Sequence, residues 1–276
     1  MSGIRDIKRR LSSIKNMRKI TGAMYMVSSA RLKVAQKKAL DFGDVFDRMQ
    51  EIMAKIPATL KNVDEYSPVF IVMASDRGLA GGYNADILKV VLNKIKPLNK
   101  FDVITIGAKA KKFFSSHGIK PLLEYTDMEK EISPEALEEI SERAIKEYES
   151  NRSIFAVYTH FKSPGVQEVK VVKILPPEKT EKKEKGNEKK RLYIFEPSPE
   201  ELINLLVKFY VKMSLYGFYL HSYASEQAFR MRAMESATEN ADNLLEDLSL
   251  KFHQERKAII TREITEIVSG AENYLH

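Results

Sequence analysis

The chain has 276 residues, no cysteine and a formal net charge of +7. The lack of cysteine excludes disulfides and thiolate metal sites, and it favours a reducing, cytoplasmic compartment. No stretch approaches the ~18 uncharged apolar residues that span a bilayer. The N-terminal residues lack the apolar run of a secretory signal. We therefore expect a cytoplasmic protein of one or two domains with at least one substantial core.

The positive charge is concentrated at the start of the chain. Residues 1–40 hold eleven Lys and Arg against one acid, Asp6, which gives +10. The remaining residues hold 34 basic and 37 acidic side chains, which gives −3. All of the positive excess therefore lies on the first segment.

Proline divides the chain into three parts. All ten prolines lie between Pro57 and Pro199, with 56 proline-free residues before them and 77 after. A proline inside a helix costs about 3 kcal/mol or more, so long helices need proline-free sequence. We predict a helix over residues 1–57, a globular domain over 66–197 and a second helix over 198–276.

Apolar residues of the first segment recur at steps of three and four, with one stutter. This spacing is typical of a coiled-coil seam. The predicted seam contains Ile4, Ile7, Leu11, Ile14, Met17, Thr21, Met24, Val27, Leu32, Ala35, Ala39, Phe42, Phe46, Met49, Met53 and Ile56.

The second long helix begins at Ser198-Pro199-Glu200-Glu201, a typical helix start. Gly217 is a candidate interruption of this helix. Its predicted seam contains Leu202, Leu206, Phe209, Met213, Leu220, Ala224, Ala228, Met231, Ala241, Leu245, Leu248, Phe252, Ile260, Ile264, Ile267 and Ala271.

Both helices join the middle domain at their inner ends, so they should pair antiparallel. Residue 56 then lies near residues 200–205, and residue 4 near residues 252–257. Residues 258–276 have no partner in this chain, although one face of this overhang is apolar. An uncovered apolar tip predicts a hydrophobic socket in another protein.

The middle domain alternates strands and helices. Apolar runs at residues 69–74, 101–107 and 153–159 predict buried strands, and helices are predicted over 85–95, 108–117 and 134–148. This order predicts a Rossmann-like α/β fold with a mainly parallel sheet. Residues 166–175 and 192–195 should form a hairpin at the sheet edge, joined by a charged surface loop over 178–191.

The glycine-rich turn from Gly78 to Asn84 follows the first strand, where a dinucleotide fold binds phosphate. It matches neither the dinucleotide pattern nor a phosphate loop, so we expect its glycines to serve tight-turn geometry. The five histidines (117, 160, 221, 253 and 276) have no metal-binding spacing. We predict no cofactor, no metal and no catalytic site.

Several segments resemble one family. The gamma subunits of F-type ATP synthases are similar to this chain nearly end to end and in the same order. The segments that carry the resemblance are Ile20-Thr-Gly-Ala-Met-Tyr-Met-Val27, Ser75-Asp-Arg-Gly-Leu-Ala-Gly-Gly-Tyr-Asn84, Ala224-Ser-Glu-Gln-Ala-Phe-Arg230, Arg232-Ala-Met-Glu-Ser-Ala-Thr-Glu-Asn240 and Ile260-Thr-Arg-Glu-Ile-Thr-Glu-Ile-Val-Ser-Gly-Ala271.

The resemblance implies a rotor shaft without catalytic residues of its own. In that family the coiled coil stands inside a hexamer of three alpha and three beta subunits, and the globular domain sits with epsilon on the membrane c-ring. Proton flow turns the shaft, which drives the catalytic beta subunits through their states. The resemblance also implies a peripheral position at the cytoplasmic face of a bacterial inner membrane, reached only through the c-ring.

The resemblance also implies site residues. Partner contacts are expected at Arg9, Lys19, Met24, Arg256 and Lys257, and the bearing tip comprises Ile260, Ile264, Ile267 and Val268. The family often has glutamine where this chain has Lys257. Ala80 stands where a cysteine is common, the charged loop over 178–191 is atypical, and no cysteine-bearing regulatory insert is present.

Two other classes of protein stay open on the residues alone. The basic N-terminal segment could bind nucleic acid through phosphates. Against this, Tyr25 is the only aromatic residue before Phe42. An α/β nucleotide-binding enzyme with helical arms is a third possibility, and the degenerate glycine turn argues against it. The rotor interpretation predicts no nucleic-acid partner.

Overall fold

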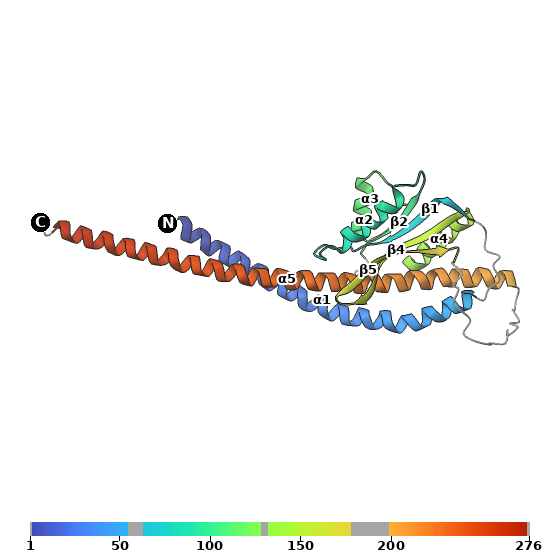
Figure 1. Cartoon of the computed structure of the whole chain (residues 1–276), viewed down its shortest axis with the longest axis horizontal. Helices are drawn as coiled ribbons and strands as arrows, with labels where there is room; N and C mark the ends of the chain where they lie inside the picture. The colour runs from blue at the N-terminus through green and yellow to red at the C-terminus, as the bar shows by residue number, and fades with distance from the viewer. Residues whose placement is uncertain (1, 55–62, 128–131, 178–198, 275–276) are drawn as a thin grey trace. The chain divides into compact units, whose positions relative to one another are not determined.

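The computed structural model describes residues 2–54, 63–127, 132–177 and 199–274 (Figure 1). The chain divides into two compact units, which we call the body (residues 29–229) and the distal coil (residues 1–28 with 230–276). Helices α1 (Ser2–Ala54) and α5 (Pro199–Tyr274) contribute to both units. The predicted organisation into 1–57, 66–197 and 198–276 stays a prediction, because most of its boundaries lie outside the described residues.

The body contains a five-stranded sheet in the order β3-β2-β1-β4-β5. Its first four strands in that order run parallel, and β5 is antiparallel to β4. The predicted α/β fold with a mainly parallel sheet is therefore confirmed. The strands are β1 (Asp64–Met73), β2 (Asp102–Ile106), β3 (Leu123–Tyr125), β4 (Arg152–Ser163) and β5 (Val166–Leu175).

Alternate residues of the central strand belong to two hydrophobic cores. Phe70 and Val72 pack with α2 (Tyr83–Ile95) and α3 (Ala108–Ser116). Ile71 and Met73 pack with α4 (Pro134–Glu149) and with residues of α1 and α5. Both faces of the sheet are thus covered, which explains why β1 ends in an unbroken apolar run rather than an alternating one.

The predicted helices of the middle domain are confirmed to within about two residues, which is ordinary variation for helix ends. The three-residue strand β3 was not predicted, and β4 runs four residues further than expected. The predicted hairpin partner of 166–175 was residues 192–195, whereas the structure pairs β5 with β4. Residues 192–195 and the charged loop 178–191 lie outside the described residues.

Helix α5 is continuous through Gly217. A Cβ atom at this position would lie 2.7 Å from Cε1 of Phe42 in α1. The glycine therefore lets the Phe42 ring approach the backbone of α5. The same ring makes an edge contact with Tyr216, with ring centroids 5.2 Å apart. Gly217 is thus a packing site in the body, and the predicted interruption of the helix is wrong.

The seam of α1 follows a strict heptad without the predicted stutter. Two residues assigned to the seam from the sequence, Met17 and Val27, are more than half exposed, whereas Thr21 and Ser28 are buried. The apolar residues on either side fix the phase, so the positions between them face α5 even where they are polar. The observed seam positions are Ile4, Ile7, Leu11, Ile14, Arg18, Thr21, Tyr25, Ser28, Leu32, Ala35, Ala39, Phe42, Phe46, Met49 and Met53.

Candidate functional site

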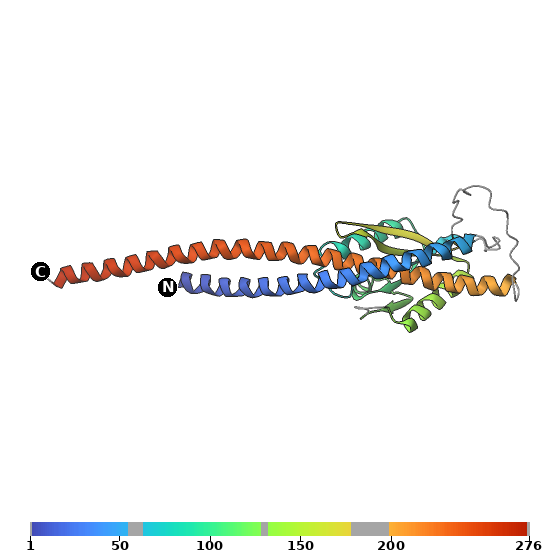
Figure 2. The ribbon, with the colours of Figure 1, turned by 90° about the horizontal axis from the view of Figure 1, so that it is seen from below.

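In the distal coil, α1 and α5 run antiparallel, and both views show α5 continuing past the start of α1 (Figures 1 and 2). Thr238 donates a hydrogen bond to Thr21, with 2.8 Å between the two Oγ1 atoms. Arg18 forms an ion pair with Asp242. This register places residue 4 opposite about residue 256, because each step along one helix is matched by an equal step along the other. The predicted register of the outer end and the overhang that follows from it are confirmed, whereas residue 56, predicted to lie near residues 200–205, is outside the described residues.

The start of α1 carries a row of cations that the distal coil does not neutralise. Only Arg18 among the basic residues of this segment forms an ion pair with a described residue. Exposed pairs contribute at most about 1 kcal/mol, so this row adds little to the stability of the coil itself. The other cations, all exposed, are Arg5, Lys8, Arg9, Arg10, Lys15 and Lys19.

The predicted contact residues are distributed along the distal coil and do not form one cluster. Arg9 and Lys19 are exposed on α1, and Met24 is half-buried beside the seam. Arg256 and Lys257 are exposed on α5, opposite the first residues of α1. Together they form an extended surface that a surrounding partner could contact at several levels.

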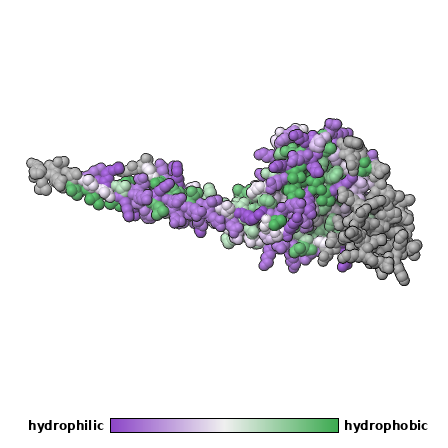
Figure 3. All heavy atoms as spheres, viewed as in Figure 1, coloured by the Kyte–Doolittle hydropathy of each residue, from purple (hydrophilic) through white to green (hydrophobic). Residues whose placement is uncertain are grey.

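The tip of α5 is apolar and uncovered. Ile260, Ile264, Ile267 and Val268 are between 43% and 72% exposed. Figure 3 shows apolar side chains uncovered near the C-terminal end of this helix. A group of large apolar side chains at this exposure is a candidate contact surface for another molecule.

The apolar face of the tip is not a continuation of the coil seam, so the prediction that Ile260, Ile264 and Ile267 extend this seam is wrong. The heptad through Leu245, Leu248 and Phe252 leads on to Ile259 and then to the exposed, polar Arg262 and Glu266. Ile260 and Ile267 lie one position after seam positions, and Ile264 and Val268 lie two positions after them, which rotates their face by about 100° or more around the helix. The tip is therefore shaped for a surface other than an extended α1.

A second exposed apolar group on α1 was missed in the sequence. Met17, Ile20, Met26 and Val27 are each about half to two-thirds exposed and lie outside the seam. Their position in the heptad could have revealed them. Ile20 and Val27 each lie one residue before a seam position, Thr21 and Ser28, and so fall outside the seam. Three of the four, Ile20, Met26 and Val27, lie within the Ile20–Val27 segment that carries the family resemblance.

The glycine-rich turn of the body holds three helices in place. Asn84 accepts a hydrogen bond from the Ser75 backbone N–H at 3.0 Å, and Asp76 caps α3 by accepting from the Ala108 N–H at 2.9 Å. The Tyr83 hydroxyl donates to the Ser222 carbonyl of α5 at 3.2 Å. Gly81 has a positive φ of 51°, as the predicted tight-turn role requires.

Two histidines meet inside the body. The rings of His160 on β4 and His221 on α5 are 4.3 Å apart. Burial, with the neighbouring His160, lowers the pKa of His221 to about 4, although its hydrogen bond to the Phe161 backbone opposes the shift. Burial, with Lys170 and Lys162, also lowers the pKa of His160. Both rings are therefore neutral near pH 7.

Catalytic features are not found within the described ranges. No group of three or more His, Cys, Asp or Glu among these residues could hold a metal ion. None of the helices in the described part of the chain is long and apolar enough to cross a membrane. A paired-helix coil with an uncovered tip, joined to an α/β body, defines the class as a coiled-coil protein with an α/β domain.

Comparison with known proteins identifies the family. A family model described as ATP synthase matches residues 3–273. The ATP synthase gamma chain of Heliobacterium modesticaldum is 36% identical, over 98% of this chain and 99% of its own length. That of Halothermothrix orenii is 35% identical, over 99% of each chain. The chain belongs to the ATP synthase gamma chain family, whose members are non-catalytic subunits of the central stalk, the rotor, of F-type ATP synthases.

Solved structures show the same fold. A chain of the Euglena gracilis mitochondrial ATP synthase (OSCP/F1/c-ring, rotational state 3) aligns with a TM-score of 0.73 at 18% identity, covering all of this chain and 95% of its own length. A chain of the Tetrahymena thermophila enzyme (central stalk/c-ring) gives 0.63 at 23% identity, covering 79% of this chain and 99% of its own.

Proposed function

We propose that this chain is the torque-carrying shaft of a bacterial ATP synthase. In this proposal the distal coil turns inside a hexamer of three alpha and three beta subunits, and the body stands with epsilon on the c-ring. Ion flow through the c-ring turns the shaft, and the shaft drives each beta subunit in turn through its catalytic states. The chain supplies no catalytic residue and needs no cofactor.

The observation that carries the proposal is the uncovered apolar tip of α5. Ile260, Ile264, Ile267 and Val268 lie beyond the last partner from α1 and off the seam that α1 would cover. Burying each side chain against a socket is worth up to about 1.5–3 kcal/mol, depending on how exposed it was. A smooth apolar socket forms no directional bonds, so a helix could turn within it. The tip therefore suits a bearing.

The exposed cations of the distal coil suit contacts that form and break as the shaft turns. Arg9, Lys19, Arg256 and Lys257 are exposed, and Met24 lies among them at the coil surface. Charge pairs at an exposed interface are weak individually and act mainly on orientation and association rate. The cations would contact the acidic loops of one beta subunit after another, and no single contact would be strong enough to stop rotation.

The cellular position follows from the partners in this proposal. The shaft reaches the membrane only through the c-ring, at the cytoplasmic face of the bacterial inner membrane. The relatives with the matching sequences are bacterial proteins, which supports this assignment.

A nucleic-acid-binding coiled coil is the second candidate function. It is favoured by the exposed cations at the start of α1, from Arg5 to Lys19, which could contact phosphates along a backbone. Against it, acidic residues line the α5 segment of the same coil, including Glu235, Glu239 and Glu246. These carboxylates would repel a backbone that wraps around the coil.

Co-expression with alpha and beta subunits tests the proposal. We expect a complex of three alpha, three beta and one copy of this chain by mass measurement, with ATPase turnover that depends on the chain. A chain that stays alone and supports no activity would overturn the proposal. Tight duplex binding with a steep salt dependence would then favour the second candidate.

A further inference from the structure

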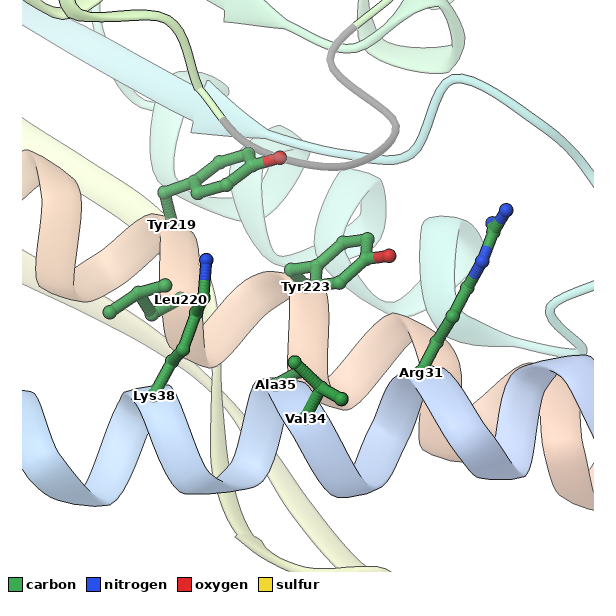
Figure 4. A pocket seen from close by; sticks show the side chains of 7 residues that line it. All are labelled: Arg31, Val34, Ala35, Lys38, Tyr219, Leu220 and Tyr223. Atoms are coloured by element: carbon green, nitrogen blue, oxygen red, sulfur yellow. The ribbon is translucent and has the colours of Figure 1, made fainter.

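A pocket of about 250 Å³ lies between the two long helices within the body (Figure 4). None of the sequence patterns pointed to it. Helix α1 contributes Arg31, Val34, Ala35 and Lys38, and helix α5 contributes Tyr219, Leu220 and Tyr223.

The floor of the pocket is apolar. Ala35, Tyr219 and Leu220 are nearly fully buried in the contact between the helices. Val34 stands at the rim and is 61% exposed. An uncovered concave apolar surface of this kind gains free energy when another apolar group fills it.

Cations stand at both ends of the pocket. Arg31 and Lys38 are seven residues apart on α1, which separates them by about 10 Å along the helix axis. Figure 4 shows both side chains extending from α1 toward the α5 side, with Val34 and Ala35 between them. Arg31 forms no ion pair with any residue of the described ranges. A ligand with negative charge on either side of an apolar group would complement the charge of both side chains.

Two tyrosines form the opposite wall. The rings of Tyr219 and Tyr223 lie one helical turn apart and nearly parallel, with centroids 6.3 Å apart. Burial, together with the nearby Glu226, raises the pKa of Tyr219 above its usual range. The phenol is therefore protonated near pH 7. Tyrosine and arginine are also the residue types that dominate binding energy at protein interfaces.

The size of the pocket favours a protein segment over a small molecule. Small-molecule sites have volumes of about 300–1,000 Å³, above the volume of this pocket. One large apolar side chain would fill it. Carboxylates about 10 Å apart would reach both cations, and a helix offers that spacing between residues seven apart.

We propose that this pocket docks an acidic segment of a partner protein, which inserts one large apolar side chain over Ala35 and Leu220 and places carboxylates near Arg31 and Lys38. The proposal rests on the proposed function, because the partner is a subunit of the assembled complex. It adds a contact site in the body to those already proposed for the distal coil.

Photo-cross-linking within the purified complex tests the proposal. Val34 is replaced by p-benzoylphenylalanine, which the exposed rim accommodates, and the cross-linked peptide is mapped by mass spectrometry. We expect one acidic partner segment. Arg31→Glu and Lys38→Glu should each lower the cross-link yield about fivefold or more, since each places a like charge against the partner. Lys37→Glu, an exposed matched reversal outside the pocket, should change the yield less than twofold.

Three results would overturn the docking site. They are a yield from position 34 no higher than from the same probe at Lys33, a cross-linked segment with more basic than acidic residues, and equal effects of the reversals at 37 and 38. If the complex forms by mass but shows one of these results, the docking site alone is wrong. If no complex forms, the proposed function fails and the docking site fails with it.

Discussion

The body and the distal coil are built from the same two helices and hold them together differently. In the body, the seam of α1 contains the buried Leu32 and Ala39, and Phe42, whose ring contacts Tyr216 of α5. In the distal coil, the seam includes Thr21 and Arg18, and the Ile4–Ile14 stretch is only half-buried. The body therefore buries a large set of apolar side chains in two internal cores, whereas most apolar side chains of the distal coil stay half-buried or exposed beside its cations.

This difference suits a shaft. A body that must stay rigid needs a dry, fully packed core, which gives it high local stability. A coil that must contact several subunits in turn needs exposed groups, at the cost of its own stability. Substitutions at three sites and one change of pH test this difference between the body and the distal coil.

The largest effect is expected at Gly107, between β2 and α3. An added Cβ would lie 2.2 Å from the Ala74 carbonyl oxygen, and the residue has a φ of 98°. Gly107→Ala should destabilise the body by more than about 4 kcal/mol, because neither backbone can move away. The control is Gly118→Ala, which has a similar positive φ of 71° and open space around it. It should cost only about 1–2 kcal/mol in denaturant unfolding. Equal costs would contradict the close packing assigned to this part of the body.

The second largest effect is expected from lowering the pH, which should reduce the stability of the body through protonation of His221. Its pKa is near 4 in the folded chain and about 6.5 when unfolded, so between these values the unfolded state binds more protons. The stability contributed by the neutral ring is complete above pH 6.5 and is lost as the pH falls toward 4, by about 3 kcal/mol in total. Melting temperatures between pH 4 and 7.5 would show this decline. His221→Gln should flatten the profile in this window, and an unchanged profile would remove His221 as its source.

Replacing Gly217 with alanine should have a smaller effect on the free energy of unfolding. The change should destabilise the chain, although helix propensity alone would favour alanine. Alanine favours a helix over glycine by about 1 kcal/mol, but its Cβ would overlap the Phe42 ring, which costs about 1–3 kcal/mol. Gly217→Ala should therefore destabilise the chain by up to about 2 kcal/mol in urea unfolding. In the Phe42→Leu background the same change should become neutral or stabilising. A stabilising effect in the wild-type background would show that the two helices are loosely packed here.

The tip should give the smallest effect on the isolated chain. Ile264→Ser with Ile267→Ser should change the unfolding free energy by less than about 0.5 kcal/mol, because both side chains are largely exposed. In the assembled complex the same pair should weaken seating of the shaft and lower coupled activity. The matched control is Thr261→Ser with Thr265→Ser, exposed neighbours of unchanged polarity. Full coupling in the isoleucine variant would remove the tip from the bearing role.

Much of the fold could be predicted because its signals are local and strong. The apolar runs at 69–74, 101–107 and 153–159 predicted the parallel strands, and the proline-free ends predicted both long helices. The coil register followed from the inner ends of the helices, and the structure confirms it through Thr21 and Thr238. The short β3 has only three residues, too few for a pattern to emerge.

The remaining errors have physical causes. Met17 and Val27 looked like seam residues because they are apolar, but the heptad phase is set by longer stretches on either side. Gly217 looked like a helix breaker because the facing ring of Phe42 is 175 positions away in sequence. The tip was predictable, since it needed only helix lengths. The pocket was not, because it depends on how Arg31 and Lys38 rotate toward Tyr219 and Tyr223.

Hydrogen–deuterium exchange of the full chain, alone and in the complex with alpha and beta subunits, is the most direct test of this contrast. We expect the backbone amides of residues 2–28 and 230–274 to exchange quickly in the free chain and to become protected in the complex. The sheet and α2 of the body should be equally protected in both. A distal coil as protected as the body when alone, or unchanged on assembly, would contradict the account.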